Sequence, residues 1–173
     1  MAKHPQHVNA IDGYYRTPAV AALAERHFQL AQLLHRNESS VEPRGPFENT
    51  PLHSAAFYGY LEMVQVLLDY GVDFDAENSY RCTPLDFASH GRHNEPRVVQ
   101  LLIEHGADPN ARDVKGSTPL HTASGGRMIE IVRLLIEHGA NVEVKDNEGR
   151  TPLDVASGKQ RERIVEVLSE YIP

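Results

Sequence analysis

Apolar residues recur at spacings of three and four within the stretch 118–140, which reads TPLHTASGGRMIEIVRLLIEHGA. The apolar stripe consists of Ile129, Val132, Leu135 and Ile136. This spacing predicts an amphipathic helix. A shorter helix over residues 119–124 precedes it, because Thr118 can cap a helix start and Pro119 fits the first helical position. Glycines end both helices, and the pair needs neighbours to bury its apolar surface.

The same pattern recurs along the chain with a nearly constant period. A threonine–proline pair begins each copy, at Thr17, Thr50, Thr83, Thr118 and Thr151. The successive steps between these threonines are 33, 33, 35 and 33 residues. In the last four copies a leucine and then a histidine or aspartate follow the pair. Tandem copies of this kind predict stacked units that bury their apolar faces against one another.

This pattern closely resembles the ankyrin repeat, with its T-P-L-H start, a later alanine, a leucine pair and a G-A-D or G-A-N end. The resemblance covers nearly the whole chain. It implies an all-α fold, an ankyrin-repeat solenoid of stacked helix-turn-helix units with β-hairpin-like connecting loops. We expect one domain with repeats at about residues 12–44, 45–77, 78–112, 113–145 and 146–173. The first and last repeats are expected to act as caps.

The first repeat departs from the pattern. Val20 stands where the motif has histidine, and Glu38 stands where Gly71 and Gly139 close other repeats. We expect its buried face to consist of Leu23, Leu30, Leu33 and Leu34. A degenerate terminal copy is typical of a cap, because one of its faces meets water. Residues 37–46 predict an irregular loop, and the pattern does not explain His35, which stands where this argument requires an apolar residue.

The third and last repeats carry two further departures. The 35-residue step places two extra residues in the segment 91–96, and Pro96 is predicted to begin the following outer helix. In the last repeat we expect one apolar face, formed by Ile164, Val165, Val167 and Leu168. Ser169 replaces an apolar residue of the inner repeats, which suits a face without a following repeat. The chain stops at Pro173 without another hairpin, so we expect a C-terminal cap.

Composition narrows the function classes. With 17 basic and 24 acidic residues, the net charge of −7 argues against general nucleic-acid binding, which needs a basic face. The longest apolar runs, such as 101–103, are too short to cross a bilayer, and residues 1–10 lack the apolar core of a signal peptide. A single cysteine, Cys82, allows no internal disulfide. We therefore expect no membrane association and a cytoplasmic or nuclear location.

The signals for chemistry are incomplete. His90 and His93 have a spacing seen in metal sites, but no cysteine or carboxylate cluster completes a tetrahedral set. Arg81 next to Cys82 would lower the pKa of the thiol, yet no base or orienting partner can be assigned to it. Phosphate loops and nucleophile motifs do not occur in the sequence. We predict no enzyme activity, no catalytic residue, no metal and no cofactor.

The resemblance assigns structural roles to the other polar motif residues. His53 and His121 of T-P-L-H are implied to hydrogen-bond to the backbone and to the neighbouring repeat. Asp86 and Asp154 occupy the same position, where a side-chain-to-backbone bond serves equally well. Asn110 loosely resembles a site of asparagine hydroxylation, although asparagine is also common in hairpins.

The resemblance places function on a surface, because ankyrin repeats bind proteins with hairpin tips and inner helices along a concave face. We therefore expect a non-catalytic scaffold or adaptor. Five aromatic residues occupy positions that packing leaves free, all in the first three repeats: Tyr14, Phe47, Phe57, Tyr58 and Tyr80. Aromatic residues are enriched at binding hot spots. The alternative is that Phe57 and Tyr58 pack between inner helices and that Tyr14 covers the cap.

His90, Arg92 and His93 in the extended loop are expected near this aromatic patch. If they contribute, partner affinity changes as the pH passes about 6.5, and a flat profile would exclude the contribution. Two alternatives stay open: a targeting or regulatory subunit that tethers a separate catalytic partner, and a substrate of hydroxylation at Asn110. The identity of the protein partner is open, and polar caps favour a monomer.

Overall fold

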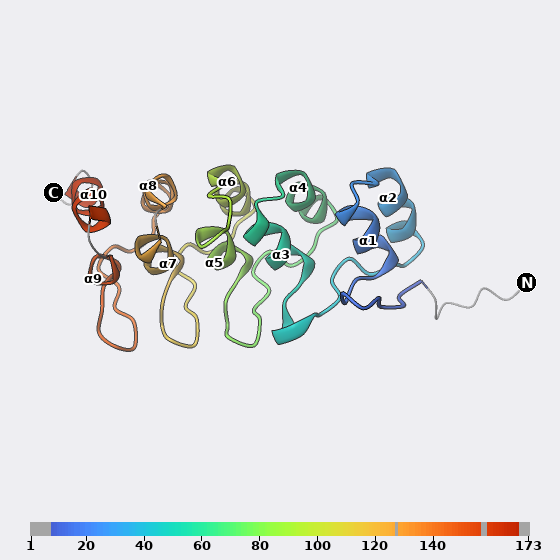
Figure 1. The fold of residues 1–173 in the computed structure, drawn as a ribbon, viewed down its shortest axis with the longest axis horizontal. Helices are drawn as coiled ribbons and strands as arrows, with labels where there is room; N and C mark the ends of the chain where they lie inside the picture. The colour runs from blue at the N-terminus through green and yellow to red at the C-terminus, as the bar shows by residue number, and fades with distance from the viewer. Residues whose placement is uncertain (1–7, 127, 157–158, 170–173) are drawn as a thin grey trace, which may run out of the picture.

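The chain folds into a row of helix pairs, each preceded by a loop that projects to one side (Figure 1). The structure is a computed structural model that describes residues 8–126, 128–156 and 159–169, with the backbone alone for 159–161, 168 and 169. The pairs are α1 (Pro18–Ala24) and α2 (Phe28–Arg36), α3 (Pro51–Tyr58) and α4 (Leu61–Asp69), α5 (Pro84–Ser89) and α6 (Pro96–Glu104), α7 (Pro119–Gly125) and α8 (Ile129–Glu137), and α9 (Pro152–Val155) and α10 (Lys159–Ser169). A 3-10 turn, η2 (Pro46–Glu48), precedes α3. Since the described residues contain helices and no strand, the predicted all-α solenoid is confirmed.

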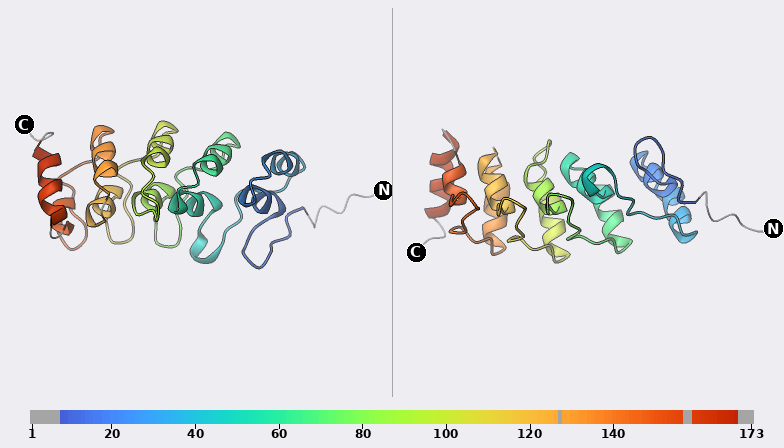
Figure 2. Two further views of the ribbon diagram at one scale, coloured as in Figure 1. Left: turned by 45° about the horizontal axis from the view of Figure 1, so that its top comes forward. Right: turned by 90° about the horizontal axis from the view of Figure 1, so that it is seen from below.

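The two helices of each pair lie in different layers. The odd-numbered inner helices form one row, the even-numbered outer helices form a second row, and the hairpin loops extend beyond the inner row (Figure 1). Further views show the same order of pairs from one end of the molecule to the other (Figure 2). We number the repeats 1 to 5 by these helix pairs. The inner helices and the hairpins therefore share one face of the stack.

Threonine caps begin the inner helices, as predicted. Thr17, Thr50, Thr83, Thr118 and Thr151 are the N-caps of α1, α3, α5, α7 and α9. At α3 the Thr50 hydroxyl accepts the N–H of His53, and the His53 ring accepts the N–H of Thr50 at 3.1 Å. Each partner thus satisfies a donor that the helix start leaves unpaired.

The capping histidines also join successive repeats. The other ring nitrogen of His53, Nε2, donates to the carbonyl oxygen of Cys82 at 3.0 Å. His121 makes the same bond to the carbonyl oxygen of Arg150 at 2.9 Å. His53 is fully buried, and desolvation lowers the pKa of its ring, so the neutral form is favoured. The structural role expected for both histidines is confirmed.

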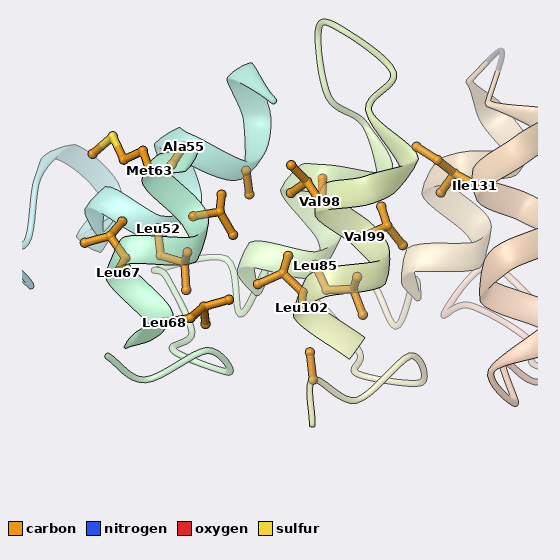
Figure 3. Packing of buried hydrophobic residues seen from close by; sticks show 14 of the residues in the cluster. Leu52, Ala55, Met63, Leu67, Leu68, Leu85, Val98, Val99, Leu102 and Ile131 are labelled. Atoms are coloured by element: carbon orange, nitrogen blue, oxygen red, sulfur yellow. The ribbon is translucent and has the colours of Figure 1, made fainter. Parts of the chain in front are cut away.

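Leucines from both layers fill the space between repeats. The leucine of the T-P-L motif and one leucine of the outer helix's leucine pair are at most 1% exposed in repeats 2, 3 and 4: Leu52, Leu85, Leu120, Leu67, Leu102 and Leu135. Figure 3 shows four of these side chains together with Val98, Val99 and Ile131 between the helices of successive repeats. Burying one such side chain contributes about 1.5–3 kcal/mol. The core is therefore one continuous layer along the stack.

The expected buried face of repeat 1 is partly wrong. Leu23 is buried and Leu34 is half-buried, but Leu30 is 47% and Leu33 58% exposed. In repeats 2, 3 and 4 the residues equivalent to Leu30 are covered: Met63, Val98 and Ile131. Met63 faces repeat 1, since it lines a cavity together with residues of α1 and α2. The equivalent side of repeat 1 has no preceding repeat among the described residues, so its leucines stay exposed.

In the last repeat, the side that would face a following repeat is the exposed one. Ile164 and Val167 are buried as expected, whereas Val165 is 44% exposed. The equivalent valines of repeats 2, 3 and 4 are fully buried: Val64, Val99 and Val132. This position is covered by a following repeat, and none follows α10 in the described residues. The expectations for the side chains of Leu168 and Ser169, and for the chain end at Pro173, lie outside what the structure describes.

His35 has a clear structural role. Its ring stacks on Tyr70 of repeat 2, with ring centroids 4.6 Å apart and an interplanar angle of 14°. This flat contact joins the outer helices of repeats 1 and 2, so a ring takes the place of an aliphatic side chain. Glu38 has a φ of +70°, the left-handed conformation that Gly71 adopts with +75°. Repeat 1 therefore ends its outer helix in the same way without a glycine.

The extended loop of repeat 3 lies where the sequence predicts it, before α6, which begins at Pro96. It reaches back to repeat 2, because the N–H of Arg92 donates to the carbonyl oxygen of Phe57 at 2.8 Å. Gly91 allows this approach, since a Cβ there would lie 3.1 Å from the carbonyl oxygens of Ala88 and Phe57. The loop thus closes over the end of α3.

Candidate functional site: an aromatic groove between the first two repeats

Polar residues hold the hairpins in the shape that presents their tips. The Asp12 carboxylate accepts the N–H of Tyr14 at 2.8 Å, and the Asn78 side chain accepts the N–H of Tyr80 at the same distance. Asp113 and Asp146 make equivalent bonds in repeats 4 and 5. This is the turn chemistry that aspartate and asparagine favour. The residue two positions after each of them is held at the tip of its hairpin.

The first three hairpins share an unusual backbone. In repeats 4 and 5 the tip contains a glycine with positive φ, 72° at Gly116 and 79° at Gly149. The equivalent residues of repeats 1, 2 and 3 are Tyr15, Glu48 and Arg81, with φ of 61°, 61° and 59°. The left-handed conformation costs a residue with a Cβ roughly 1–2 kcal/mol. The first three hairpins therefore have a residue with a side chain at a left-handed position that glycine would occupy with less strain.

The tips of repeats 2 and 3 contact each other. The rings of Phe47 and Tyr80 lie 5.6 Å apart between centroids, and the N–H of Ser79 donates to the carbonyl oxygen of Phe47 at 2.9 Å. Both rings remain accessible, with Phe47 61% and Tyr80 50% exposed. The backbone bond fixes the two tips relative to each other, so the rings form one surface across two repeats.

A groove of about 470 Å³ runs between repeats 1 and 2 on the face of the hairpins and inner helices. Its larger side chains are Tyr14, Tyr15, Arg16, Phe47, Tyr58 and Tyr60. Prolines, small residues and Met63 make up most of the rest. Three of the five predicted aromatic residues thus line one groove, and Tyr80 lies beside Phe47 next to it.

Two tyrosines of the groove were not predicted from the sequence. Tyr60 is 53% exposed and stacks against Tyr58, with ring centroids 5.5 Å apart. Tyr15 is 51% exposed at the left-handed position described above. Neither occupies one of the positions considered free in the repeat. Their proximity in sequence to Tyr14 and Tyr58 is the signal that would have found them.

The groove continues into a smaller cavity of about 270 Å³ between the same two repeats. Ala24, Tyr60 and Met63 line both spaces. The Arg26–Glu62 ion pair, 3.3 Å long, bridges the two repeats at this second cavity. Inner helices α3 and α5 pack closely along their lengths, whereas α1 and α3 approach each other at few points. The junction between repeats 1 and 2, the first junction of the stack, is therefore more open than the junction between repeats 2 and 3.

Phe57 behaves as the packing alternative predicts. It is half-buried, and its ring lies 6.2 Å from Phe87 of the next inner helix. Tyr58 is 38% exposed, lines the groove and meets Phe57 edge to face at 5.2 Å. Phe57 therefore supports the ring that the groove presents. Tyr14, 79% exposed, stands at a rim of the groove with the Arg16 guanidinium 4.9 Å from its ring.

The loop residues form a separate group. His90, Arg92 and His93 are exposed at the end of α3, and the His90 ring lies 6.3 Å from Phe57. None of the three lines the groove. His90 contacts Phe57, and Phe57 contacts Tyr58, which lines the groove. The loop is therefore close to Phe57, as expected, but it is linked to the aromatic residues of the hairpin tips only through Phe57 and Tyr58.

The described residues contain no group of three or more His, Cys, Asp or Glu placed to hold a metal ion. Burial raises the pKa of the Cys82 thiol to about 12, with the carboxylates of Asp86 and Asp113 adding to the effect. The thiol is thus protonated and a poor nucleophile at neutral pH. Asn110 uses its side chain within the fold, donating to the carbonyl oxygen of Gly139 and accepting the N–H of Asn141.

The chain matches short parts of several longer proteins that differ in kind. The chain is 34% identical over 75 residues to alpha-latrotoxin-Lg1a of Latrodectus geometricus, which is 42% of this chain and 6% of the toxin. It is 36% identical over 61 residues to the serine/threonine-protein kinase VIK of Arabidopsis thaliana, 35% of this chain and 14% of the kinase. It is 35% identical over 73 residues to ankyrin repeat and SOCS box protein 5 of Bos taurus, 42% of this chain and 22% of that protein.

These matches span less than a quarter of each relative's length. No helix among the described residues is long and apolar enough to cross a membrane. The family model for ankyrin repeats, in three copies, matches residues 19–113 and 88–172. Ankyrin repeats generally mediate protein–protein interaction. With this match across nearly all five helix pairs, the chain belongs to the ankyrin repeat family.

Proposed function

We propose that this chain is a non-catalytic interaction scaffold that binds a protein partner through the groove between repeats 1 and 2 and the tips of repeats 2 and 3. The observation that carries the proposal is the gathering of five exposed aromatic rings around one groove: Tyr14, Tyr15, Phe47, Tyr58 and Tyr60. Tyrosine and phenylalanine bring a large contact area with little rotamer entropy.

The strained hairpin tips support the same surface. Strained backbone positions cluster at functional sites, where the surrounding structure holds them in place. Tyr15, Glu48 and Arg81 carry this strain in the three repeats that hold the aromatic residues, and repeats 4 and 5 have glycine instead. Because stacked repeats fix the tips before binding, little ordering entropy is lost when a partner docks.

A crosslinking pull-down from a lysate of the source organism tests the proposal. It compares the native chain with a variant carrying Phe47→Ala, Tyr58→Ala and Tyr80→Ala. A matched control carries Val114→Ala, Lys115→Ala and Glu148→Ala at the hairpins of repeats 4 and 5. We expect a partner that the native chain and the control retain and the aromatic variant loses, with circular dichroism showing that all three fold. A partner list that the aromatic substitutions leave unchanged would refute the proposal.

A second role is favoured by the comparisons, in which the matched repeats make up 14% of a kinase and 22% of a SOCS box protein. The scaffold would then target or regulate a separate catalytic partner, and the pull-down identifies this case by recovering an enzyme. Hydroxylation of Asn110 remains a further hypothesis, which a mass spectrum of its peptide tests by a gain of one oxygen.

We further propose that the scaffold acts as a monomer with repeats 1 and 5 as its caps. The exposed leucines of the first cap, Leu30 and Leu33, are the surface on which self-association would occur. Sedimentation equilibrium over a range of concentrations measures the mass directly. A dimer mass that Leu30→Lys returns to the monomer mass would overturn this part of the proposal.

A further inference from the structure

Negative charge is concentrated in the part of the chain that forms the groove. Residues 12–77, which make repeats 1 and 2, contain 10 acidic and 4 basic residues. Their net charge is −6, out of −7 for the whole chain. A field of one sign over a binding surface attracts partners of the opposite sign and raises their association rate. The charge therefore points to a basic occupant.

Two of these carboxylates belong to residues that are next in sequence to lining residues of the groove. Glu48 lies between Phe47 and Asn49, which both line the groove, and Glu25 follows Ala24, which also lines it. Glu25 and Glu48 are exposed, and neither forms an ion pair within the part of the chain that the structure describes. Both are therefore available to a cation from outside.

The cations of the groove and of the adjoining cavity are already engaged. Arg26 pairs with Glu62 at 3.3 Å. The Arg16 guanidinium pairs with Asp12 at 2.9 Å. Arg44 donates at 3.1 Å to the backbone carbonyl oxygens of Glu48 and Glu77. None of these arginines forms an ion pair with Glu25 or Glu48 among the described residues. The groove thus keeps its excess of negative charge.

Repeat 1 itself shows how such a surface holds a guanidinium. Arg16 lies between the Asp12 carboxylate and the face of the Tyr14 ring, with its guanidinium carbon 4.9 Å from the ring centroid. Cations within about 6 Å of a ring centroid are attracted by the electron density on the ring face. A carboxylate next to an open tyrosine ring is therefore a ready site for an arginine.

The stacked rings of Tyr58 and Tyr60 offer a second tyrosine surface to a partner. Their planes are 20° apart, and both side chains are exposed. Both rings line the groove, and their exposed parts are accessible to a partner. Tyr58 comes from the end of α3 and Tyr60 from the start of α4, so the turn between the two helices fixes both rings.

We propose that the groove binds an extended basic segment of the partner protein, with arginine or lysine side chains on the Tyr58 and Tyr60 rings and ion pairs to Glu25 and Glu48. This inference rests on the proposed function and specifies the chemistry of the partner. The basic segment adds no strand or helix to the stack. It lies along the groove and is recognised by charge and ring faces.

The test measures fluorescence anisotropy with a labelled peptide of alternating arginine and serine, at physiological salt. The same peptide with glutamine or glutamate in place of arginine serves as the comparison. Tyr58→Leu with Tyr60→Leu keeps apolar surface and removes the ring faces, and Tyr58→Phe with Tyr60→Phe keeps the rings. We expect the leucine variant to lose about tenfold in affinity, since one exposed cation–π contact is worth about two- to fivefold. The phenylalanine variant should bind like the native chain.

Charge is tested at matched sites. Glu48→Gln should weaken binding of the arginine peptide about two- to threefold, and Glu143→Gln in the exposed turn after α8 should not change it. The proposal is overturned if the glutamine peptide binds as tightly as the arginine peptide, if the leucine variant retains full affinity, or if both glutamate variants weaken binding equally.

A competition experiment separates this inference from the proposed function. The arginine peptide is added to the pull-down of the native chain, and we expect it to release the partner that depends on the aromatic residues. If the partner depends on them but the peptide neither binds nor releases it, the basic segment is refuted and the scaffold function stands. If no partner depends on the aromatic residues, both are refuted.

Discussion

Replacing Asp86 by asparagine should stabilise the protein at neutral and higher pH. Asp86 occupies the position of the motif histidine and is 6% exposed. Its carboxylate accepts the N–H of Thr83 at 2.8 Å and the hydroxyl of Thr83 at 3.1 Å. Burial outweighs these bonds and, together with the nearby Asp113 charge, raises the pKa of Asp86 from 3.8 to about 7. Ionising this carboxyl group therefore opposes folding.

The sign of the pH dependence follows from proton binding. Between pH 4 and 7 the folded chain keeps the Asp86 proton that the unfolded chain has lost, so the free energy of unfolding falls as the pH rises. The pKa of Asp86 is about three pH units higher in the folded chain than in the unfolded chain, and one pH unit corresponds to about 1.4 kcal/mol. The full effect is thus about 4 kcal/mol above pH 7 and is absent near pH 4. Small backbone shifts that admit water reduce it, so we expect a gain of at least about 2 kcal/mol for Asp86→Asn at pH 8.

Urea unfolding followed by circular dichroism at pH 4.5 and pH 8 measures this effect. The two chains should be nearly equal at the lower pH and differ by the stated amount at the higher one. Asp154→Asn is the matched control, because Asp154 caps Thr151 in the same way with an exposed side chain. An equal difference between native and Asp86→Asn chains at both pH values, or a less stable variant at pH 8, would refute the reasoning.

Two further substitutions test features of the fold. Arg81→Gly relieves a residue at a φ of 59° and should raise the free energy of unfolding by about 0.5–1 kcal/mol, since glycine's greater freedom in the unfolded chain offsets part of the gain. A thermal melt with a lower midpoint would show that the tip is not strained. Ser124→Ala removes a buried hydroxyl that has no hydrogen-bond partner among the residues the structure describes, and it should stabilise the chain by about 1 kcal/mol in urea unfolding. The exposed Ser54→Ala on α3 serves as its control, and a destabilised Ser124 variant would show that the hydroxyl is paired.

The helix pairs could be predicted because their signals are local and repeated. A threonine N-cap followed by proline specifies a helix start without reference to the rest of the chain, and the longer step before Thr118 located the loop at 91–96. Burial at the ends was harder to predict. Periodicity shows which face of a helix is apolar, but not whether another repeat covers that face. Leu30 and Val165 were misjudged for this reason.

The tips of the site could be predicted, but the groove could not. Tyr14, Phe47 and Tyr80 follow from the register of the repeat, which fixes the hairpin positions. The groove exists because repeats 1 and 2 are joined by the irregular segment 37–46 and are not tightly packed. No sequence signal reports the distance between α1 and α3. Tyr60 became part of the site only through that distance.

The open first junction has a consequence for how the molecule responds to a ligand. Repeat 1 lacks much of the inter-repeat packing that holds the other pairs together, so its local opening requires less free energy than opening within repeats 2 to 4. A partner that fills the groove supplies contacts to both sides of this junction. Binding and the local order of repeat 1 are therefore linked: amide hydrogens of α1 and α2 exchange more slowly when the groove is occupied, and the tightness of binding depends on how often repeat 1 is docked.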